Sequence, residues 1–283
     1  MPDGDLPSTV GAPVDRTADL ELLVAAAREA GRIALGFFRN DPRQWTKGED
    51  SPVTEADIAS DRYLHATLTG ARPDYGWLSE ETADTADRLG RRRVFVVDPI
   101  DGTRGFIEGS HDWCVSVAIV EDGFPVAGAL AVPAREEYYQ AVLGGGAWLN
   151  GARIHVGAHL SVEGARVAGP IRHLRAFASA GLTVAERLYT PSLAYRLAMV
   201  AADRLDLATA RPHAHDWDLA AVDLLVHEAG GILRDLDGAR LRYNRLDPRH
   251  PVLIAATPRL ADAVAPLIAA AEAKAMSASG SAP

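Results

Sequence analysis

The chain has 283 residues, of which 48% are hydrophobic and 24% charged, and its formal net charge is −9. This composition supports a sizeable core, and the acidic balance, without a basic footprint, excludes bulk nucleic acid as an expected partner. Cys114 is the single cysteine, which excludes an intrachain disulfide and a multi-thiolate metal site and is typical of a reducing compartment, so a cytoplasmic protein is expected. Neither a secretory signal nor a membrane-spanning run is expected.

Both ends of the chain have the composition of tails. Residues 1–13 are rich in Gly, Pro and Asp, and residues 277–283 consist almost wholly of Ser, Ala and Gly. Neither segment has enough apolar residues to bury and order itself, so both are predicted to be disordered. Between them the pattern of elements predicts two subdomains, 17–155 and 156–270.

The first half of the chain predicts two helices followed by strands. Apolar residues recur at helical spacing over 23–38, which predicts a long first helix. After a loop containing Lys47, Thr54 and Asp57 are placed to cap a second helix. Short β-like runs follow at residues 76–79, 94–97, 114–120, 125–131 and 138–143. The glycines at 144–146 lack the Lys and Ser/Thr of a phosphate-binding loop and predict a hairpin turn.

The second half mixes helices with strands. Its predicted elements are a helix over about 192–202, a strand at 205–210, a helix over 217–229 stopped by two glycines, and a strand at 232–234. Strands grouped first and helices interleaved later predict an α+β fold with mixed layers.

Acidic residues stand where the predicted elements begin or end. Five carboxylates share this placement: Glu80, Glu81, Asp98, Asp101 and Asp218. Taken singly, each has a plainer interpretation as a turn residue, a solvated strand end or a helix-dipole partner. Taken together, they match the oxygen ligands that hard cations such as Mg²⁺ prefer, with water and substrate phosphate completing the shell. The set therefore predicts a divalent-metal site.

Two features near these carboxylates each keep two interpretations open. Asp57 either forms a capping box with Thr54 or orients a hydroxyl group or a water. Gly102 and Thr103 either form an ordinary turn or offer backbone N–H groups to a phosphate.

A small group of basic residues precedes Asp218. Arg211, His213 and His215 lie close together in the sequence. Such a group is more often solvated surface, but its position before Asp218 also suits a cationic patch beside the metal site.

Together, the motifs resemble the inositol monophosphatase family of metal-dependent phosphatases. They are Ser-Pro-Val-Thr-Glu-Ala-Asp over 51–57, Glu-Glu at 80–81, Asp-Pro-Ile-Asp-Gly-Thr over 98–103, and Trp-Asp-Leu-Ala-Ala over 217–221 continuing to Glu-Ala-Gly-Gly at 228–231. The match extends from the first helix to about residue 256. The resemblance implies a layered αβαβα sandwich, two or three Mg²⁺ ions per site, inhibition by lithium, and often a homodimer acting on a small phosphorylated metabolite.

Carried over residue by residue, the resemblance also implies roles in the site. The implied metal ligands are Glu80, Asp98, the carbonyl of Ile100, Asp101 and Asp218. The implied substrate contacts are Asp101, Gly102, Thr103, Arg211 and Asp218. Thr103 and Glu80 would position the attacking water, and Asp57 would support Thr103. The implied mechanism is in-line attack by a metal-activated water, without a covalent phosphoenzyme.

The substrate prediction depends on the residues before Trp217. Inositol phosphatases commonly place an acidic residue there, whereas this chain has Arg211, Pro212 and His213. A cationic patch suits a second anionic group, and the segments 51–57 and 77–82 are similar to the bacterial 3′(2′),5′-bisphosphate nucleotidase branch. That activity is the preferred prediction, and inositol-1-phosphatase and histidinol-phosphatase are the alternatives.

Two other classes compete with this interpretation. A haloacid-dehalogenase-type phosphatase uses an aspartyl nucleophile in Asp-x-Asp-Gly-Thr, but the spacing between Asp98 and Asp101 is one residue too long. A non-catalytic protein that kept the fold is disfavoured, because every expected ligand type is present. A trapped phosphoaspartate would favour the first class, and absence of Mg²⁺-dependent phosphate release would favour the second.

Overall fold

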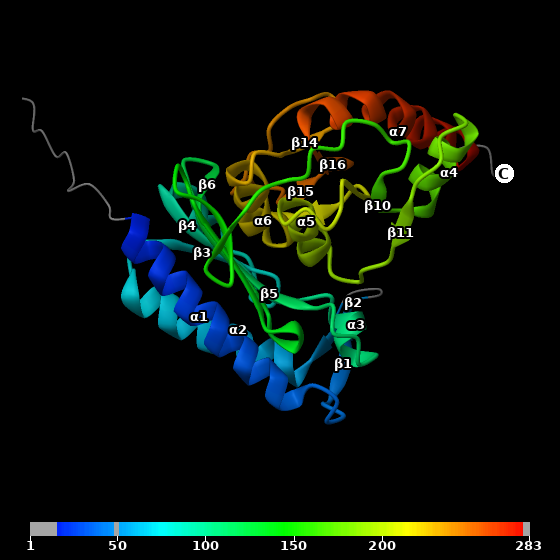
Figure 1. Ribbon diagram of the computed structural model, residues 1–283. Coiled ribbons are helices and arrows are strands. Elements are labelled where there is room, and N and C mark those ends of the chain that lie inside the picture. Colours follow the sequence, from blue (N-terminus) through cyan, green and yellow to red (C-terminus); the bar gives the residue numbers. More distant parts are fainter. Residues whose placement is uncertain (1–15, 48–50, 280–283) are drawn as a thin grey trace, which may run out of the picture.

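The computed structural model describes residues 16–47 and 51–279, which form five alternating layers (Figure 1). Helices α1 (Arg16–Phe37) and α2 (Glu55–Ala71) cover one face of a seven-stranded sheet. Helices α5 (Leu193–Ala201) and α6 (Asp216–Glu228) lie between this sheet and a five-stranded sheet. Helices α4 (Ile171–Ser179) and α7 (Pro258–Ser279) cover the outer face of the smaller sheet. The predicted α+β fold, a layered αβαβα sandwich, is confirmed.

The seven-stranded sheet has the order β3-β4-β5-β6-β7-β8-β9. Only its first pair, β3 and β4, is parallel. The strands are β3 (Gly76–Ser79), β4 (Arg93–Asp101), β5 (Cys114–Glu121), β6 (Phe124–Val132), β7 (Glu137–Val142), β8 (Gly146–Leu149) and β9 (Ala152–Ile154). Short helices flank it: α3 (Thr103–Ile107) and the 3₁₀ helices η1 (Ala86–Gly90) and η2 (Pro133–Arg135).

The five-stranded sheet has the order β11-β10-β12-β16-β14. Its strands are β10 (Arg166–Ala168), β11 (Glu186–Leu188), β12 (Leu207–Ala210), β14 (Ile232–Asp235) and β16 (Leu253–Ala256). Strand β10 is parallel to both neighbours, and β16 is antiparallel to both of its own. Two further pairs are antiparallel: β1 (Gln44–Lys47) with β2 (Ser51–Thr54), and β13 (Ala214–His215) with β15 (Arg249–His250).

Strand β4 shows why the larger sheet is apolar on both faces. Successive side chains of a strand point to opposite faces. Val94 and Val96 belong to the core shared with α5 and α6, whereas Phe95 and Val97 belong to the core under α1 and α2. A strand covered on both faces needs a continuous apolar run, as the sequence has at 94–97.

Helix α6 lies unusually close to the sheet at Gly128 of β6. A Cβ atom on this glycine would come within 3.0 Å of the Cα of Ala221. The glycine therefore permits the close backbone approach that seats α6, and with it Asp218, directly on the sheet.

Most of the predicted elements are present with small shifts at their ends. Thr54 and Asp57 form the predicted capping box of α2, and residues 144–146 form the predicted turn between β7 and β8. The loop predicted around Lys47 is wrong, because Lys47 ends β1, which pairs with β2; the residues joining the two strands lie outside the described residues.

The tail predictions are corrected at one point. Residues 277–279 were expected to be disordered but form the last turn of α7. Residues 1–13 and 280–283 lie outside the described residues.

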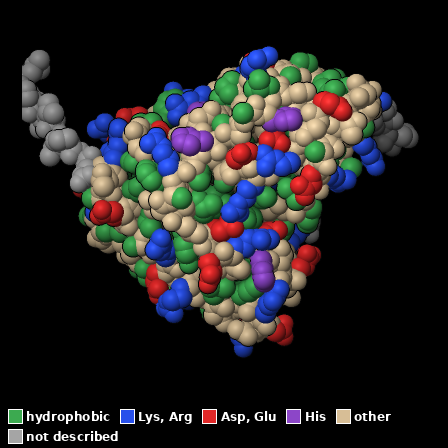
Figure 2. Space-filling view, in the orientation of Figure 1, with side chains coloured by type: hydrophobic (Ala, Val, Ile, Leu, Met, Phe, Trp, Pro, Cys, Tyr) green, Lys and Arg blue, Asp and Glu red, His purple; other side chains and the backbone are tan. Residues whose placement is uncertain are grey.

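The described ranges, 16–47 and 51–279, contain no helix with both the length and the apolar character needed to cross a membrane. Acidic and basic side chains are intermixed over the face seen in Figure 2.

Candidate metal centre

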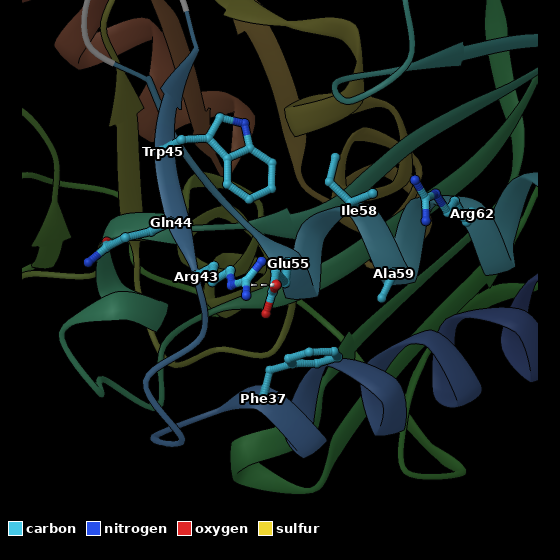
Figure 3. Close-up of a pocket in the computed structure, with 8 residues that line it drawn as sticks. All are labelled: Phe37, Arg43, Gln44, Trp45, Glu55, Ile58, Ala59 and Arg62. Atoms are coloured by element: carbon cyan, nitrogen blue, oxygen red, sulfur yellow. Dashed lines mark ion pairs between the residues drawn. The ribbon is translucent and has the colours of Figure 1, made fainter.

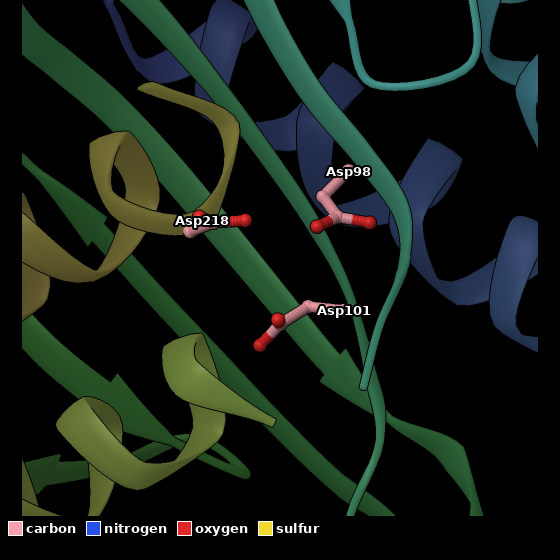
Figure 4. Close-up of side chains that lie close together, drawn as sticks. All are labelled: Asp98, Asp101 and Asp218. Carbon is pink, nitrogen blue, oxygen red and sulfur yellow. The ribbon is translucent and has the colours of Figure 1, made fainter. Parts of the chain in front are cut away.

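Three aspartates meet where β4 ends and α6 begins (Figure 4). Asp98 and Asp101 come from β4 and Asp218 from the first turn of α6, and one carboxylate oxygen of each lies within 4.8 Å of the others. In a regular strand, residues three apart point to opposite faces. The pairing of β4 with β5 is irregular between Asp98 and Asp101, and such a break re-aims side chains. This irregularity explains how both carboxylates reach one site.

The aspartates line a cavity of about 500 Å³. The other sequence-predicted residues on its wall are Glu80, Ile100, Gly102 and Thr103. Glu80 lies outside the 4.8 Å cluster, and Asp57 is buried behind Thr103. Arg211 is exposed at the end of β12 and is not part of the cavity wall.

The aspartate cluster has the properties of a cation site. Within the described ranges, Asp98 Oδ2 is buried without a hydrogen-bond partner, and none of the three aspartates forms an ion pair. Burial, reinforced by the charges of neighbouring carboxylates, raises the pKa of Asp98 and of Asp218 well above the usual range. Burial also raises the pKa of Glu80 to about 7. A divalent cation would supply the missing positive charge, so this donor set fits Mg²⁺.

Helix α5 orients Asp101 from the second half of the chain. The hydroxyl of Ser192, which is the N-cap of α5, donates to Asp101 Oδ2 at 2.5 Å, and the N–H of Ala194 donates to the same oxygen at 2.6 Å. Both bonds use Oδ2 and leave Oδ1 for a metal. Such support from outside the ligand set fixes ligand geometry. Sequence reasoning missed this role of Ser192, which was predicted only as the start of a helix.

Asp57 takes up both roles that the sequence left open. Its Oδ2 accepts from the backbone N–H and the hydroxyl of Thr54 at 2.7 and 2.6 Å. Its Oδ1 lies 3.1 Å from Thr103 Oγ1, which is also 2.9 Å from the carbonyl oxygen of Ile100. Burial raises the pKa of Asp57 to about 6, although the bonds from Thr54 oppose this. The helix cap therefore also holds the Thr103 hydroxyl beside the cavity.

Lys47 brings a positive charge to the glutamate side of the cavity. Its ammonium group donates to Glu81 Oε1 at 2.9 Å and to the carbonyl of Glu80 at 2.8 Å, and lies 3.5 Å from Glu80 Oε1. Burial alone would lower the pKa of Lys47, but the charge of Glu80 and the bond to Glu81 outweigh it, so the pKa is raised. Sequence reasoning missed this contact, because nothing local links β1 to residues 80–81.

An aromatic pair forms another part of the cavity wall. The rings of His215 and Trp217 are stacked, with centroids 4.5 Å apart and planes 3° apart. Burial lowers the pKa of His215, and the charge of Arg249 adds to this effect. His215 is therefore neutral near pH 7 and acts as a flat surface rather than as a cation.

A second hollow, of about 860 Å³, lies between the end of α1, strand β1 and the start of α2 (Figure 3). Its wall includes Phe37, Trp45 and Ile58, and an ion pair of 3.7 Å between Arg43 and Glu55. None of the residues predicted for the active site lines it, so it is separate from the metal centre.

Comparison with known proteins agrees with this site. Residues 15–274 match the inositol monophosphatase family. The chain is 38% identical to a histidinol-phosphatase of Mycobacterium tuberculosis over 78% of this chain and 88% of that protein. It is 34% identical to an inositol-1-monophosphatase of Mesorhizobium japonicum, over 80% and 88%. The crystal structure of the extragenic suppressor protein SuhB of Bartonella henselae superposes with a TM-score of 0.78 at 28% identity, over 88% and 98%.

The layered sandwich, the aspartate cluster and these relatives define a metal-dependent phosphatase. The chain belongs to the inositol monophosphatase family.

Proposed function

We propose that this phosphatase hydrolyses 3′(2′),5′-bisphosphate nucleotides in an Mg²⁺-dependent reaction. The observation that carries the substrate is Arg211, which stands where inositol phosphatases commonly have an acidic residue. Arg211 follows β12 and precedes β13, whose His215 lines the metal cavity. A positive charge at this position favours a substrate with a second anionic group.

The residues of the cavity have separate proposed roles in phosphate ester hydrolysis. The proposed ligands of two or three Mg²⁺ ions are Glu80, Asp98, the carbonyl of Ile100, Asp101 and Asp218. The bound ions would lower the pKa of water and stabilise the leaving oxygen. Asp57 holds the Thr103 hydroxyl, and Thr103 with Glu80 orients the attacking water. The N–H groups of Gly102 and Thr103 bind the phosphate.

The turn before α3 lies close to the start of α5, and a glycine makes this possible. Gly102 has a φ of 94°, which side-chain-bearing residues rarely adopt, and a Cβ there would come within 3.0 Å of Ser192 Cβ. The glycine therefore permits the turn to pack closely against Ser192 at the start of α5, beside the cavity where the N–H groups of Gly102 and Thr103 are proposed to bind the phosphate.

The stacked rings of His215 and Trp217 add support for a planar group in the substrate. A base stacked on an aromatic side chain contributes about 1–3 kcal/mol. A purine or an imidazole ring gains this contact, whereas the saturated ring of inositol does not. The pair therefore favours a nucleotide or histidinol phosphate over inositol 1-phosphate.

Histidinol phosphate is the second candidate substrate. It is supported by the 38% identity with a protein named histidinol-phosphatase and by the same aromatic pair. Inositol 1-phosphate is third, supported by the relatives named inositol-1-monophosphatase. Lithium inhibition, a homodimer and a cytoplasmic location stay predictions from the sequence.

A comparison of kcat/KM for three substrates tests the proposal. Adenosine 3′,5′-bisphosphate, histidinol phosphate and inositol 1-phosphate are assayed with Mg²⁺ under identical conditions. The bisphosphate is expected to have the highest kcat/KM, by at least about tenfold, since one ionic contact is worth about 1.5–3 kcal/mol. A higher value for histidinol phosphate would overturn the substrate assignment and leave the phosphatase class intact.

A further inference from the structure

Two buried carboxylates lie one turn apart on helix α2. Asp57 and Asp61 are four residues apart, so they share one face of the helix. Asp57 holds the Thr103 hydroxyl beside the metal cavity. Asp61 is also buried, and within residues 16–47 and 51–279 it joins no ion pair. A buried carboxylate without a counter-ion depends on its hydrogen-bond donors, so the donors indicate what it does.

The donors to Asp61 are the hydroxyl groups on either side of Glu80 and Glu81. Ser79 Oγ donates to Asp61 Oδ1 at 2.5 Å, and Thr82 Oγ1 donates to Asp61 Oδ2 at 2.9 Å. An ionised carboxylate only accepts, so both hydroxyl protons point at Asp61. The Ser79 oxygen thereby keeps its lone pairs for the N–H of Glu81, which donates to it at 3.3 Å. Asp61 therefore fixes both ends of the segment that carries the two glutamates.

This segment lies beyond the paired part of the larger sheet. Strand β3 ends at Ser79, and residues 80–82 form a bend. The N–H of Glu80 donates to the carbonyl of Val97 at 3.2 Å, and Val97 directly precedes Asp98 on β4. The sheet therefore sets where the bend begins, and the bonds to Asp61 set the direction that the chain takes past Glu80.

We propose that Asp61 is a positioning residue of the active site, which fixes Glu80 relative to Thr103 through one turn of α2. The inference rests on the proposed roles of Glu80 and Thr103 in orienting the attacking water, and it deepens them. Both groups have to face one water, so the distance between them matters as much as the position of each. Asp57 and Asp61 belong to the same turn of one helix, so helix geometry sets that distance.

Removal of the Asp61 carboxylate is the first test. In Asp61→Ala, kcat is expected to fall about 10–100-fold, the usual effect of replacing a residue that supports a metal ligand. The KM should change little, because Asp61 is not among the described residues that line the cavity. Calorimetric titration with Mg²⁺, without substrate, should show an affinity lowered about tenfold. The kinetic assay uses whichever of the three substrates named above has the highest kcat/KM, so the result does not depend on the substrate assignment.

Two serine variants form a matched pair. Ser79→Ala removes one of the two hydroxyls that bind Asp61, so it should lower kcat by a smaller factor, about 3–10-fold. Ser60→Ala removes another buried hydroxyl of α2, which donates to the carbonyl of Ala30 of α1 at 3.3 Å. It should keep the wild-type kcat and Mg²⁺ affinity. Both substitutions remove the same buried group, so the difference between them isolates the contact with Asp61.

A double-mutant cycle with Glu80→Gln separates positioning from stability. If Asp61 acts through Glu80, Asp61→Ala should lower kcat by less than about twofold once Glu80 is already glutamine. A residue that only stabilises the fold would lower kcat by the same factor in both backgrounds. Calorimetry with Mg²⁺ gives the concentration of binding-competent protein for each variant, which corrects kcat for any unfolded fraction.

The outcomes distinguish this inference from the proposed function. A near-normal kcat in Glu80→Gln would overturn the role proposed for Glu80, and the positioning role with it. A low kcat in Glu80→Gln, with the full effect of Asp61→Ala repeated in that background, would overturn the role of Asp61 alone. If Asp61→Ala does not fold, the serine pair decides, and equal kcat values for Ser79→Ala and Ser60→Ala would overturn the inference.

Discussion

Two groups of buried carboxylates in this protein differ in the source of the positive charge that neutralises them. The paired group is Asp19 with its arginines, and the unpaired group is the aspartate cluster of the metal centre. Asp19 of α1 is fully buried and accepts hydrogen bonds from Arg72 at 2.9 Å, Arg93 at 2.7 Å and Tyr75 at 3.0 Å. Asp98 is just as buried, but within the described ranges it accepts only the N–H of Ile100, at 3.0 Å. The chain neutralises the first carboxylate itself, whereas the proposed Mg²⁺ would neutralise the second.

The difference separates a structural acidic residue from a functional one. Burial alone does not distinguish Asp19 from Asp98, nor does residue type. The distinguishing feature is the missing partner, which keeps oxygen atoms available and costs stability that only a ligand restores. Substitutions in each of the two groups test this distinction.

The largest effect is expected in the unpaired group. Asp101→Asn and Asp218→Asn should each lower kcat at least about 1,000-fold, because the metal contributes several kcal/mol to transition-state stabilisation. Circular dichroism should show an intact fold, and the unfolding temperature without Mg²⁺ should not fall, since each substitution removes a repelled charge. A near-normal kcat in either variant would refute its role as a metal ligand.

The paired group should respond in stability instead. Asp19→Ala is expected to lower the free energy of unfolding by about 3 kcal/mol, because it removes a carboxylate partner from the buried guanidinium of Arg93. Asp262→Ala, which breaks an exposed pair with Arg234, is the control and should cost at most about 1 kcal/mol. Urea denaturation measures both. If Asp19→Ala reduced the Mg²⁺ affinity of the folded protein, the two groups would not be independent.

The smallest effect is a pH dependence confined to the unpaired group. Burial raises the pKa of Asp98 and Asp218, and raises that of Glu80 to about 7. Protons therefore compete with Mg²⁺ as the pH falls, and affinity should drop by about tenfold per pH unit for each proton displaced. Calorimetry between about pH 8 and pH 6 in buffers of different ionisation enthalpy measures affinity and proton release. An Mg²⁺ affinity that does not change with pH would contradict the raised pKa values.

The sequence predicted the parts of the site that depend on local chemistry. An apolar run followed by Asp98, Pro99 and Asp101 predicts a buried strand ending in carboxylates, and Thr54 with Asp57 predicts a helix cap. Both predictions are confirmed, because capping and strand burial are decided within a few residues.

The parts that depend on distant contacts could not be predicted in the same way. Ser192 and Asp101 are 91 residues apart, and no local pattern indicates that they meet. The sequence predicts a loop at Lys47 because glycine and proline follow it, whereas Lys47 ends β1, which pairs with β2, and its ammonium group contacts Glu80 and Glu81. Helix α7 was missed because its alanine-rich sequence runs into a segment with the composition of a tail.

The hydrogen bond from Ser192 to Asp101 gives the capping of α5 a second consequence. Fraying of the first turn of α5 would withdraw two hydrogen-bond donors from Asp101, a proposed ligand of the ion, even while the rest of the fold stays intact. Weaker packing of α5 against Asp101 should therefore lower the affinity for the ion before it unfolds the protein. Occupancy of the ion site would then report how tightly the two halves of the chain are joined.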